Sequence, residues 1–186
     1  MSELCSDTIS AYPGPVMFSP TDPQYLISIS DERVWQWDAN GCQIRPPFYS
    51  SYAAFSSDGA QFVSCFEQTI TVYDSCYGVI FAEFQAAGSA HLCCFSPDNR
   101  LVAVAVDETA YCWDITTSKP QLVGIFIGHT QMITSLIFSS STTLVSVSQG
   151  RSVKFWKVGT ESIDPPIVDL GHTYLPSAPI KSVTLL

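Results

Sequence analysis

The segment "AHLCC", residues 90–94, places a histidine beside two cysteines and is the one metal-like cluster in this sequence. If the segment is a β-strand, His91 and Cys93 point to one side and Cys94 to the other, because successive side chains alternate. One face then offers at most two ligands, whereas a tetrahedral zinc site needs four. We therefore interpret the segment as a cysteine-rich core strand and expect no metal and no other cofactor.

Carboxylates are the second group that could support chemistry, because two convergent acids can hydrolyse a glycosidic bond. They recur at Asp31, Asp58, Asp98 and Asp107. Each lies at a turn signal, where aspartate stabilises the local backbone. The sequence contains no Gly-x-Ser-x-Gly elbow and no phosphate-binding glycine-rich loop. We expect no catalytic residues, and a hydrolase that uses turn carboxylates remains the alternative.

The turns and the aromatic residues that follow them recur along the chain. Four units start at a phenylalanine before a turn and close on an aromatic residue: Phe18 and Trp37, Phe55 and Tyr73, Phe95 and Trp113, and Phe138 and Trp156. The phenylalanines are 37, 40 and 43 residues apart, and the closing residues 36, 40 and 43. Two sets of positions that drift together indicate a true repeat.

The third unit predicts four strands, at Ala90–Phe95, Leu101–Val106, residues 109–113 and Gln121–Phe126. The second of these is "LVAVAV", which has no polar alternation. A strand with water on one side should alternate, so this strand is expected to be buried on both faces. Four antiparallel strands in about 40 residues are typical of a β-propeller blade packed between two neighbours. The sequence therefore predicts an all-β fold.

Composition limits the classes of partner and the cellular compartment. The chain has 186 residues, with 8 basic against 17 acidic residues, and its net charge of −9 disfavours nucleic acid. Seven cysteines lie mostly within apolar runs, as expected in a reducing compartment, so we expect the cytosol or nucleus. Residues 2–12 lack the apolar stretch of a signal peptide. Residues 120–150 carry no acidic or basic charge, but "GHTQ" and a hydroxyl block interrupt them, so we expect no membrane span.

The segments "FSPDNRL", "VDETAYCWD", "SISDERVWQWD" and "GHTQMITSLIFSSSTTLVSVSQGRSVKFWKV" resemble the WD-repeat (WD40) β-propellers. The resemblance covers about residues 16–186. It implies four four-stranded blades and the first strand of a fifth, which is an incomplete ring. The implied repeats span about 10–48, 49–85, 86–127 and 128–170, with a partial repeat at 171–186. The sequence of the repeats also resembles the repeat region of fungal NTPase-type receptor proteins.

In WD repeats, a Gly-His histidine, a second-strand hydroxyl, a turn aspartate and a third-strand tryptophan form a hydrogen-bonded set. The resemblance assigns the turn acid to Asp31 and Asp107, the histidine to His129 and His172, and the indole to Trp37, Trp113 and Trp156, with Tyr73 in the place of the second unit's tryptophan. Gly150 stands where the fourth unit's acid is expected, and Ala86-Ala87 where the third unit's Gly-His is expected. No unit is expected to hold a complete set, so packing must dominate.

Loops carry function on such scaffolds, and two kinds of loop share one face: those entering first strands and those joining second to third strands. The predicted partner-binding residues there are Phe66, Glu67, Ser89, Gln131 and Gln149. Phe66 is either an exposed contact residue or the end of a buried strand. We expect a non-enzymatic scaffold for protein or peptide partners, with acidic rims that steer basic segments. Self-association through the incomplete ring is also expected, and a degenerate fragment of a larger WD-repeat protein is the other alternative.

Overall fold

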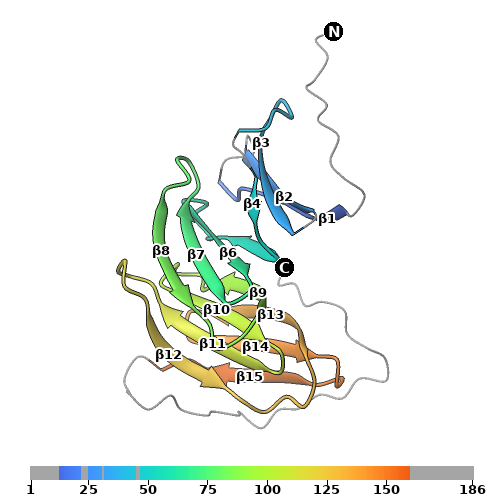
Figure 1. Ribbon diagram of the computed structural model, residues 1–186. Helices are drawn as coiled ribbons and strands as arrows, with labels where there is room; N and C mark the ends of the chain where they lie inside the picture. Colours follow the sequence, from blue (N-terminus) through green and yellow to red (C-terminus); the bar gives the residue numbers. More distant parts are fainter. Residues whose placement is uncertain (1–12, 22–24, 31, 45–46, 160–186) are drawn as a thin grey trace.

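The computed structural model describes residues 13–21, 25–30, 32–44 and 47–159, and all their regular structure is β-strand (Figure 1). No helix long and apolar enough to cross a membrane occurs in these residues. The strands are β1 (Pro13–Phe18), β2 (Tyr25–Ser30), β3 (Arg33–Asp38), β4 (Phe48–Tyr49), β5 (Tyr52–Phe55), β6 (Gln61–Phe66), β7 (Thr69–Asp74), β8 (Ile80–Gln85), β9 (Ala90–Phe95), β10 (Leu101–Val106), β11 (Thr109–Asp114), β12 (Gln121–Phe126), β13 (Ile133–Ser140), β14 (Thr143–Ser148) and β15 (Val153–Lys157).

The strands form four antiparallel sheets, each made of consecutive strands. We name them blade 1 (β1–β4), blade 2 (β5–β8), blade 3 (β9–β12) and blade 4 (β13–β15). The blades follow one another in chain order and do not close into a ring in the described part of the chain (Figure 1). The all-β, propeller-type prediction is confirmed. The expected outer strand of the fourth blade and the first strand of a fifth lie outside the described residues.

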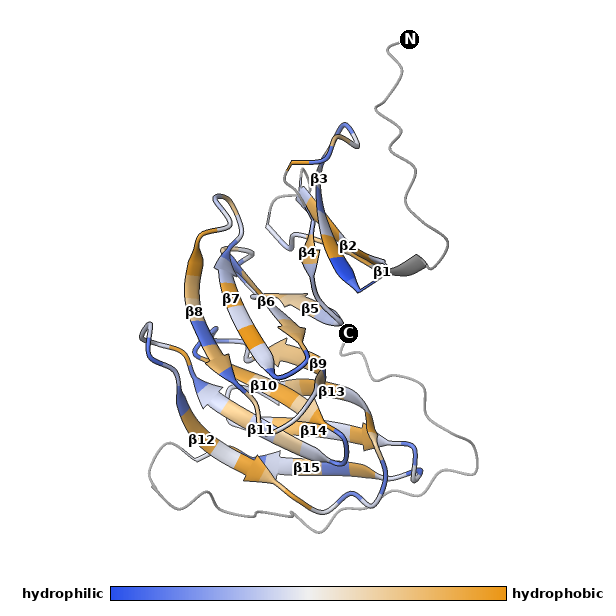
Figure 2. Ribbon diagram, viewed as in Figure 1, coloured by the Kyte–Doolittle hydropathy of each residue, from blue (hydrophilic) through white to orange (hydrophobic). Residues whose placement is uncertain are grey.

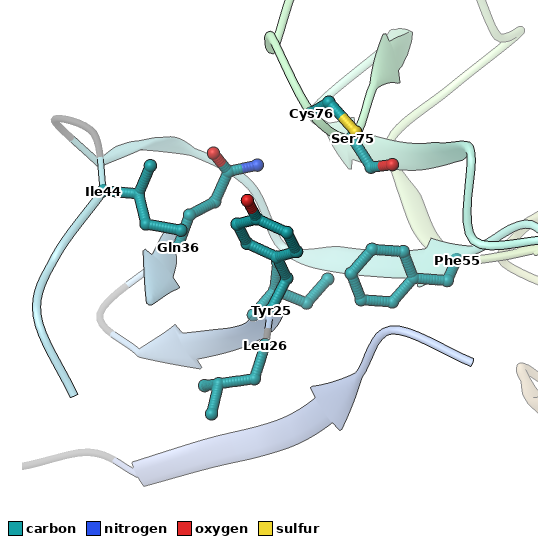
Figure 3. A pocket seen from close by; sticks show the side chains of 8 residues that line it. Tyr25, Leu26, Gln36, Ile44, Phe55, Ser75 and Cys76 are labelled. Atoms are coloured by element: carbon teal, nitrogen blue, oxygen red, sulfur yellow. The ribbon is translucent and has the colours of Figure 1, made fainter. Parts of the chain in front are cut away.

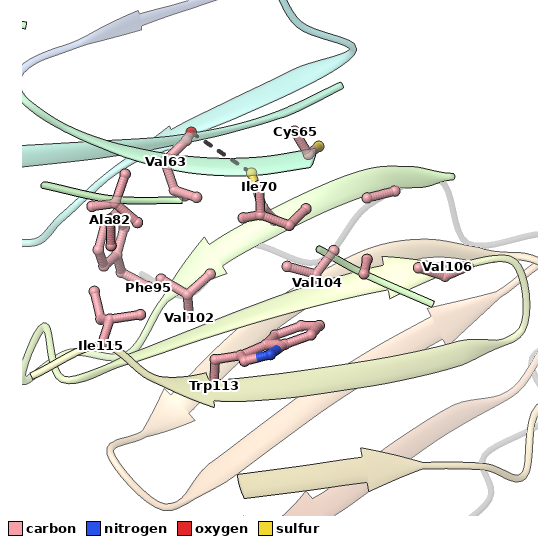
Figure 4. Packing of buried hydrophobic residues seen from close by; sticks show 14 residues of the cluster. Val63, Cys65, Ile70, Ala82, Phe95, Val102, Val104, Val106, Trp113 and Ile115 are labelled. Atoms are coloured by element: carbon pink, nitrogen blue, oxygen red, sulfur yellow. Dashed lines mark hydrogen bonds between the residues drawn. The ribbon is translucent and has the colours of Figure 1, made fainter. Parts of the chain in front are cut away.

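The predicted strands of the third unit agree with β9, β10, β11 and β12 to within one residue. All six residues of β10 are buried, as the run "LVAVAV" predicts. Val104 packs in a cluster with Val63 of blade 2 (Figure 4). Ala103, on the other face of the same strand, packs with Leu144 of blade 4. Figure 2 shows that β10 is coloured mostly as hydrophobic. Burial on both faces therefore holds adjacent blades together.

A backbone hydrogen bond between neighbouring blades recurs three times at one end of the strands. The donor is the N–H group at the start of the next blade's first strand, or two residues before it in blade 2. The acceptor is the carbonyl of a turn residue between the second and third strands, and each acceptor residue has a positive φ of 49–56°. The pairs are Ser50 to Glu32 at 2.8 Å, Ala90 to Glu67 at 2.6 Å and Ile133 to Asp107 at 2.8 Å. We call these bonds the blade links.

The turns at the opposite ends of the strands are also tied together. In blade 2 the Ser56 hydroxyl donates to the Asp58 carboxylate at 2.7 Å and accepts from the backbone N–H of Gln61. The bond from Ser56 lowers the pKa of Asp58, so its carboxylate is charged at neutral pH. Thr21 of blade 1 donates to the Asp58 carbonyl at 2.8 Å. Both ends of the strands are therefore fixed between blades 1 and 2.

The burial of the cysteines predicts how their thiols react. Cys65, Cys93 and Cys112 are buried, whereas Cys76 is exposed. Burial raises the pKa of Cys93 and Cys112 well above the usual value, which removes the reactive thiolate. Iodoacetamide should therefore modify Cys76 rapidly in the native protein and the three buried thiols only after unfolding. Site-resolved mass spectrometry with and without urea measures this, and rapid native labelling of Cys93 would contradict the blade packing.

An exposed apolar face on blade 1 predicts self-association of the chain. Val16 and Phe18, which pair across from Ser28 and Leu26, lie on the face turned away from blade 2 and are 57% and 62% exposed. Apolar side chains exposed in this way promote association. The apparent mass by light scattering should rise with protein concentration, and Phe18→Glu should reduce that rise. A monomer at all concentrations would show that this face does not self-associate.

Candidate protein-binding face

The blade links lie on the strand ends where the partner-binding residues were predicted. We call this surface the loop face, and it comprises residues 32, 49–51, 66–68, 86–89, 107–108, 127–132 and 149–152. Each blade link joins a turn of one blade to the entry of the next. The loops are therefore held by the backbone of the neighbouring blade as well as by their own sequence. The backbone positions from which their side chains project are fixed.

The structure places all five predicted partner-binding residues on the loop face. Glu67, Ser89, Gln131 and Gln149 are exposed, and Phe66 is half-buried. Gln149 is partly engaged, because its backbone N–H donates to the Met132 carbonyl at 2.9 Å. Whether these residues bind a partner stays a prediction.

Phe66 belongs to a cluster that combines two aromatic rings with a guanidinium group. Its ring lies 5.2 Å from the ring of Tyr49, which is 57% exposed. The Arg33 guanidinium lies 5.0 Å above the Tyr49 ring, and Arg33 Nη2 is 3.4 Å from the Tyr49 hydroxyl. We call Arg33, Tyr49 and Phe66 the aromatic cluster. It joins the end of β4 in blade 1 to the end of β6 in blade 2.

Arg33 and Tyr49 are not among the residues predicted from the sequence. They meet because β3 and β4 pair with Arg33 opposite Tyr49, and this register has no local sequence signal. The available hint was the aromatic pair Phe48-Tyr49 at the expected start of the second repeat. An exposed aromatic residue at a loop position can act as a binding contact, as was expected for Phe66.

The charges on the loop face are unevenly distributed. Exposed acids lie on the turns of blades 1, 2 and 3, at Glu32, Glu67, Asp107 and Glu108. Blade 4 carries Arg151 at the corresponding turn. Asp31, the predicted turn acid of the first unit, lies outside the described residues. The acidic turns of blades 1 and 2 flank the aromatic cluster, so its surroundings favour a basic partner surface.

Blade 4 contains a buried hydrogen-bond network centred on Ser146. The Trp156 indole N–H donates to the Ser146 hydroxyl at 2.7 Å, and His129 Nε2 lies 2.7 Å from the same hydroxyl. His129 Nδ1 is 2.8 Å from the Ser152 hydroxyl, which also contacts Ser148 at 2.9 Å. His129 is 5% exposed. A serine hydroxyl lies within hydrogen-bond distance of each ring nitrogen of His129, so the histidine has a structural role.

This network corrects the expectation that blade 4 relies on packing because it lacks the acid. Gly150 does stand in the turn, but Ser152 supplies a hydroxyl to His129 Nδ1 instead. Ser152 lies beyond the turn, so this substitution becomes visible only when the side chains are placed in space. His172, the predicted histidine of the next unit, lies outside the described residues.

Gly128 explains why a glycine precedes the histidine. A Cβ atom on Gly128 would lie 3.1 Å from the Trp156 ring and 3.4 Å from Lys154 Nζ. The Lys154 ammonium itself lies 5.6 Å from the Trp156 ring centre. The close approach of backbone to these side chains favours a residue without a side chain.

The other blades keep parts of the network. Trp37 donates to Ser28 at 2.9 Å in blade 1. In blade 2, burial raises the pKa of Tyr73, while hydrogen bonds with Thr71 and Ser64 oppose this increase. Blade 3 has Val104 at the position of these serines, and Trp113 packs against Phe84 with ring centres 5.0 Å apart. Asp107 is exposed, and its backbone carbonyl forms a blade link.

The metal-like segment "AHLCC" forms most of strand β9. His91 Nε2 contacts the Ile133 carbonyl at 2.7 Å, and the Cys93 thiol contacts the carbonyls of Tyr52 and Val63 at 3.8 Å. No group of three His, Cys, Asp or Glu side chains with metal-binding geometry occurs among the described residues. The segment is a core strand in contact with both neighbouring blades.

Comparisons with known proteins agree with the fold. The family "WD domain, G-beta repeat" matches residues 84–114 and 120–157. WD repeat-containing protein 37 of Homo sapiens is 37% identical over 65 residues, which cover 34% of this chain and 13% of that protein. Target of rapamycin complex subunit wat1 of Schizosaccharomyces pombe is 28% identical over 102 residues, which cover 54% and 32%. Small ribosomal subunit protein RACK1y of Oryza sativa is 26% identical over 158 residues, which cover 77% and 47%.

The chain therefore spans less than half the length of the curated relatives it matches. These relatives give no support to the further likeness to fungal NTPase-type receptor proteins.

The serine network predicts a graded loss of stability. Ser146→Ala should lower the free energy of unfolding by about 2–3 kcal/mol, because it removes the hydroxyl that contacts both His129 Nε2 and the Trp156 indole N–H. Ser28→Ala, which removes a single bond to Trp37, should cost about 1 kcal/mol. Urea unfolding measures both. An equal or smaller effect of Ser146→Ala would show that the network is not stabilising.

Proposed function

We propose that this chain, which carries WD repeats, is a non-enzymatic module that binds protein or peptide partners through its loop face. The aromatic cluster is the observation that carries this proposal. Tyrosine and arginine are enriched among the residues that dominate binding energy at protein interfaces. Tyr49 is exposed, yet it is held between Phe66 and Arg33. A side chain that is already ordered loses little entropy on binding.

The acidic turns around the cluster define the kind of partner. Glu32 and Glu67 are exposed beside it, and the chain as a whole has a net charge of −9. A basic segment is therefore attracted towards the face, and its apolar side chains can stack on Tyr49. The names of two relatives place them in assemblies, wat1 in the target of rapamycin complex and RACK1y in the small ribosomal subunit. This supports a protein partner here by analogy.

Localisation in the cytosol or nucleus is part of the same proposal. The six described cysteines form no disulfide, and three of them are buried in the core. Free thiols of this kind suit a reducing compartment.

The test compares partner capture by matched variants. Tyr49→Ala should lower the affinity for a captured partner about 30-fold, which corresponds to the roughly 2 kcal/mol that a dominant contact residue contributes. Glu67→Lys should also weaken binding of a basic partner, and more strongly at low salt than at high salt, because it reverses a charge beside the cluster. Both residues have exposed side chains, so the melting temperature should not change.

Tyr77→Ala is the matched control, because Tyr77 is 79% exposed and precedes β8, away from the loop face. Partners are identified by mass spectrometry and their affinities measured by titration. Retained binding in Tyr49→Ala and Glu67→Lys, or loss of binding that accompanies unfolding, would contradict the proposal.

A further inference from the structure

A hollow lies between blades 1 and 2 at the strand ends opposite to the loop face. Its inner part is lined by Ile27, Gln36, Ile44 and Phe55, and its outer part by Asp58 and Thr21; both parts share Tyr25, Ser75 and Cys76. Asp58 precedes β6 and Glu67 follows it, so the hollow and the aromatic cluster lie at opposite ends of the same strand. Neither the sequence nor the comparisons assign a function to this hollow.

The short outer strand of blade 1 keeps the hollow open. β4 has two residues, whereas β8 and β12 have six each. Tyr25 and Ile44 consequently stay 38% and 39% exposed. Gly59, with a φ of 66°, lines the outer part, and a Cβ there would clash with Thr21 Oγ1. The turn therefore packs closely against blade 1 at this edge of the hollow.

The inner part is lined by a largely buried polar side chain, Gln36, which is 7% exposed. Figure 3 shows its amide and the Tyr25 hydroxyl turned towards Ser75 and Cys76 across the hollow. The inner volume of about 10 Å³ suits at most one water molecule.

The outer part has room for a side chain and is rich in acceptors. Its volume of about 140 Å³ is far above the roughly 10–15 Å³ that a single water needs. The Asp58 carboxylate accepts from Ser56 and from the backbone N–H of Ala60, which leaves lone pairs available. Thr21 and Tyr25 add hydroxyl groups, and the Tyr25 ring adds an aromatic face. This combination is complementary to a cation.

We propose that the hollow binds one lysine or arginine side chain from an extended segment of a partner protein. The cationic group contacts Asp58 and the hydroxyls, while its aliphatic stem lies along the Tyr25 ring. An acidic side chain is repelled by Asp58, and a purely apolar one leaves the carboxylate without a counter-charge. This docking site goes beyond the loop face and does not depend on the proposed function.

Cys76 provides a reporter at the rim of the hollow. The test measures the rate at which iodoacetamide modifies Cys76 in the full chain, with site-resolved mass spectrometry. The probe is the peptide acetyl-Gly-Ser-Leu-Lys-Leu-Ser-Gly-amide. We expect saturable protection of about fivefold, and none from peptides with norleucine or glutamate in place of lysine. A concentration of about 10 mM suffices, since it occupies about 90% of a site with a Kd of 1 mM.

Two variants assign the protection to the hollow. Asp58→Asn should abolish it by removing the charge, and Asp98→Asn should retain it. Asp98 is a matched control, because it accepts from Ser96 at 2.6 Å in the equivalent turn of blade 3. Ala60→Trp fills the hollow from an exposed position without removing a turn hydrogen bond, so it decides the case if Asp58→Asn lowers the melting temperature.

Equal protection by the lysine and norleucine peptides, protection that survives Asp58→Asn and Ala60→Trp, or no protection at about 10 mM would each overturn the proposal. Tyr49→Ala should leave the protection unchanged. A failure at the hollow and a failure at the loop face are therefore separate results.

Discussion

The blade link is the constraint on which the rest of this structure depends. A carbonyl at a turn residue with positive φ accepts the N–H group where the chain enters the next blade, and this occurs at Glu32, Glu67 and Asp107. Side chains other than glycine carry a conformational cost in this region, so the bond must compensate for it. Once the link is made, the start of the next first strand is fixed in position. The apolar faces of adjacent blades then meet in register.

The links also explain how blades with different interiors share one architecture. Blade 4 contains the serine–histidine–tryptophan network, whereas blade 3 has Val104 at the serine position and an apolar interior. A satisfied polar network and a packed apolar face are both stable solutions, provided that no buried group is left unpaired. The backbone contact between blades is common to both. The interior of a blade can therefore vary while its position is preserved.

Much of the fold was predictable, because it follows from local patterns. Turn signals and the run "LVAVAV" placed the strands of blade 3 to within one residue, since burial on both faces leaves a clear trace in the sequence. Blade 1 has no such trace in its outer strand: β4 has two residues and follows a segment rich in proline. The pairing of Arg33 with Tyr49 and the contact of Ser152 with His129 depend on register and on side chains distant in sequence. Local patterns do not encode such contacts.

The two candidate surfaces lie at opposite ends of β6, whose six residues span about 20 Å. A partner side chain at Asp58 therefore cannot contact Tyr49, and two segments can bind at the same time. Both ends belong to the junction of blades 1 and 2, which is tied by the Ser50–Glu32 link at one end and by the Thr21–Asp58 bond at the other. The two proposed sites therefore share one interface between blades. Because this junction is tied at both ends, the distance between the sites is set by the backbone of β6 and the bonds at its two ends.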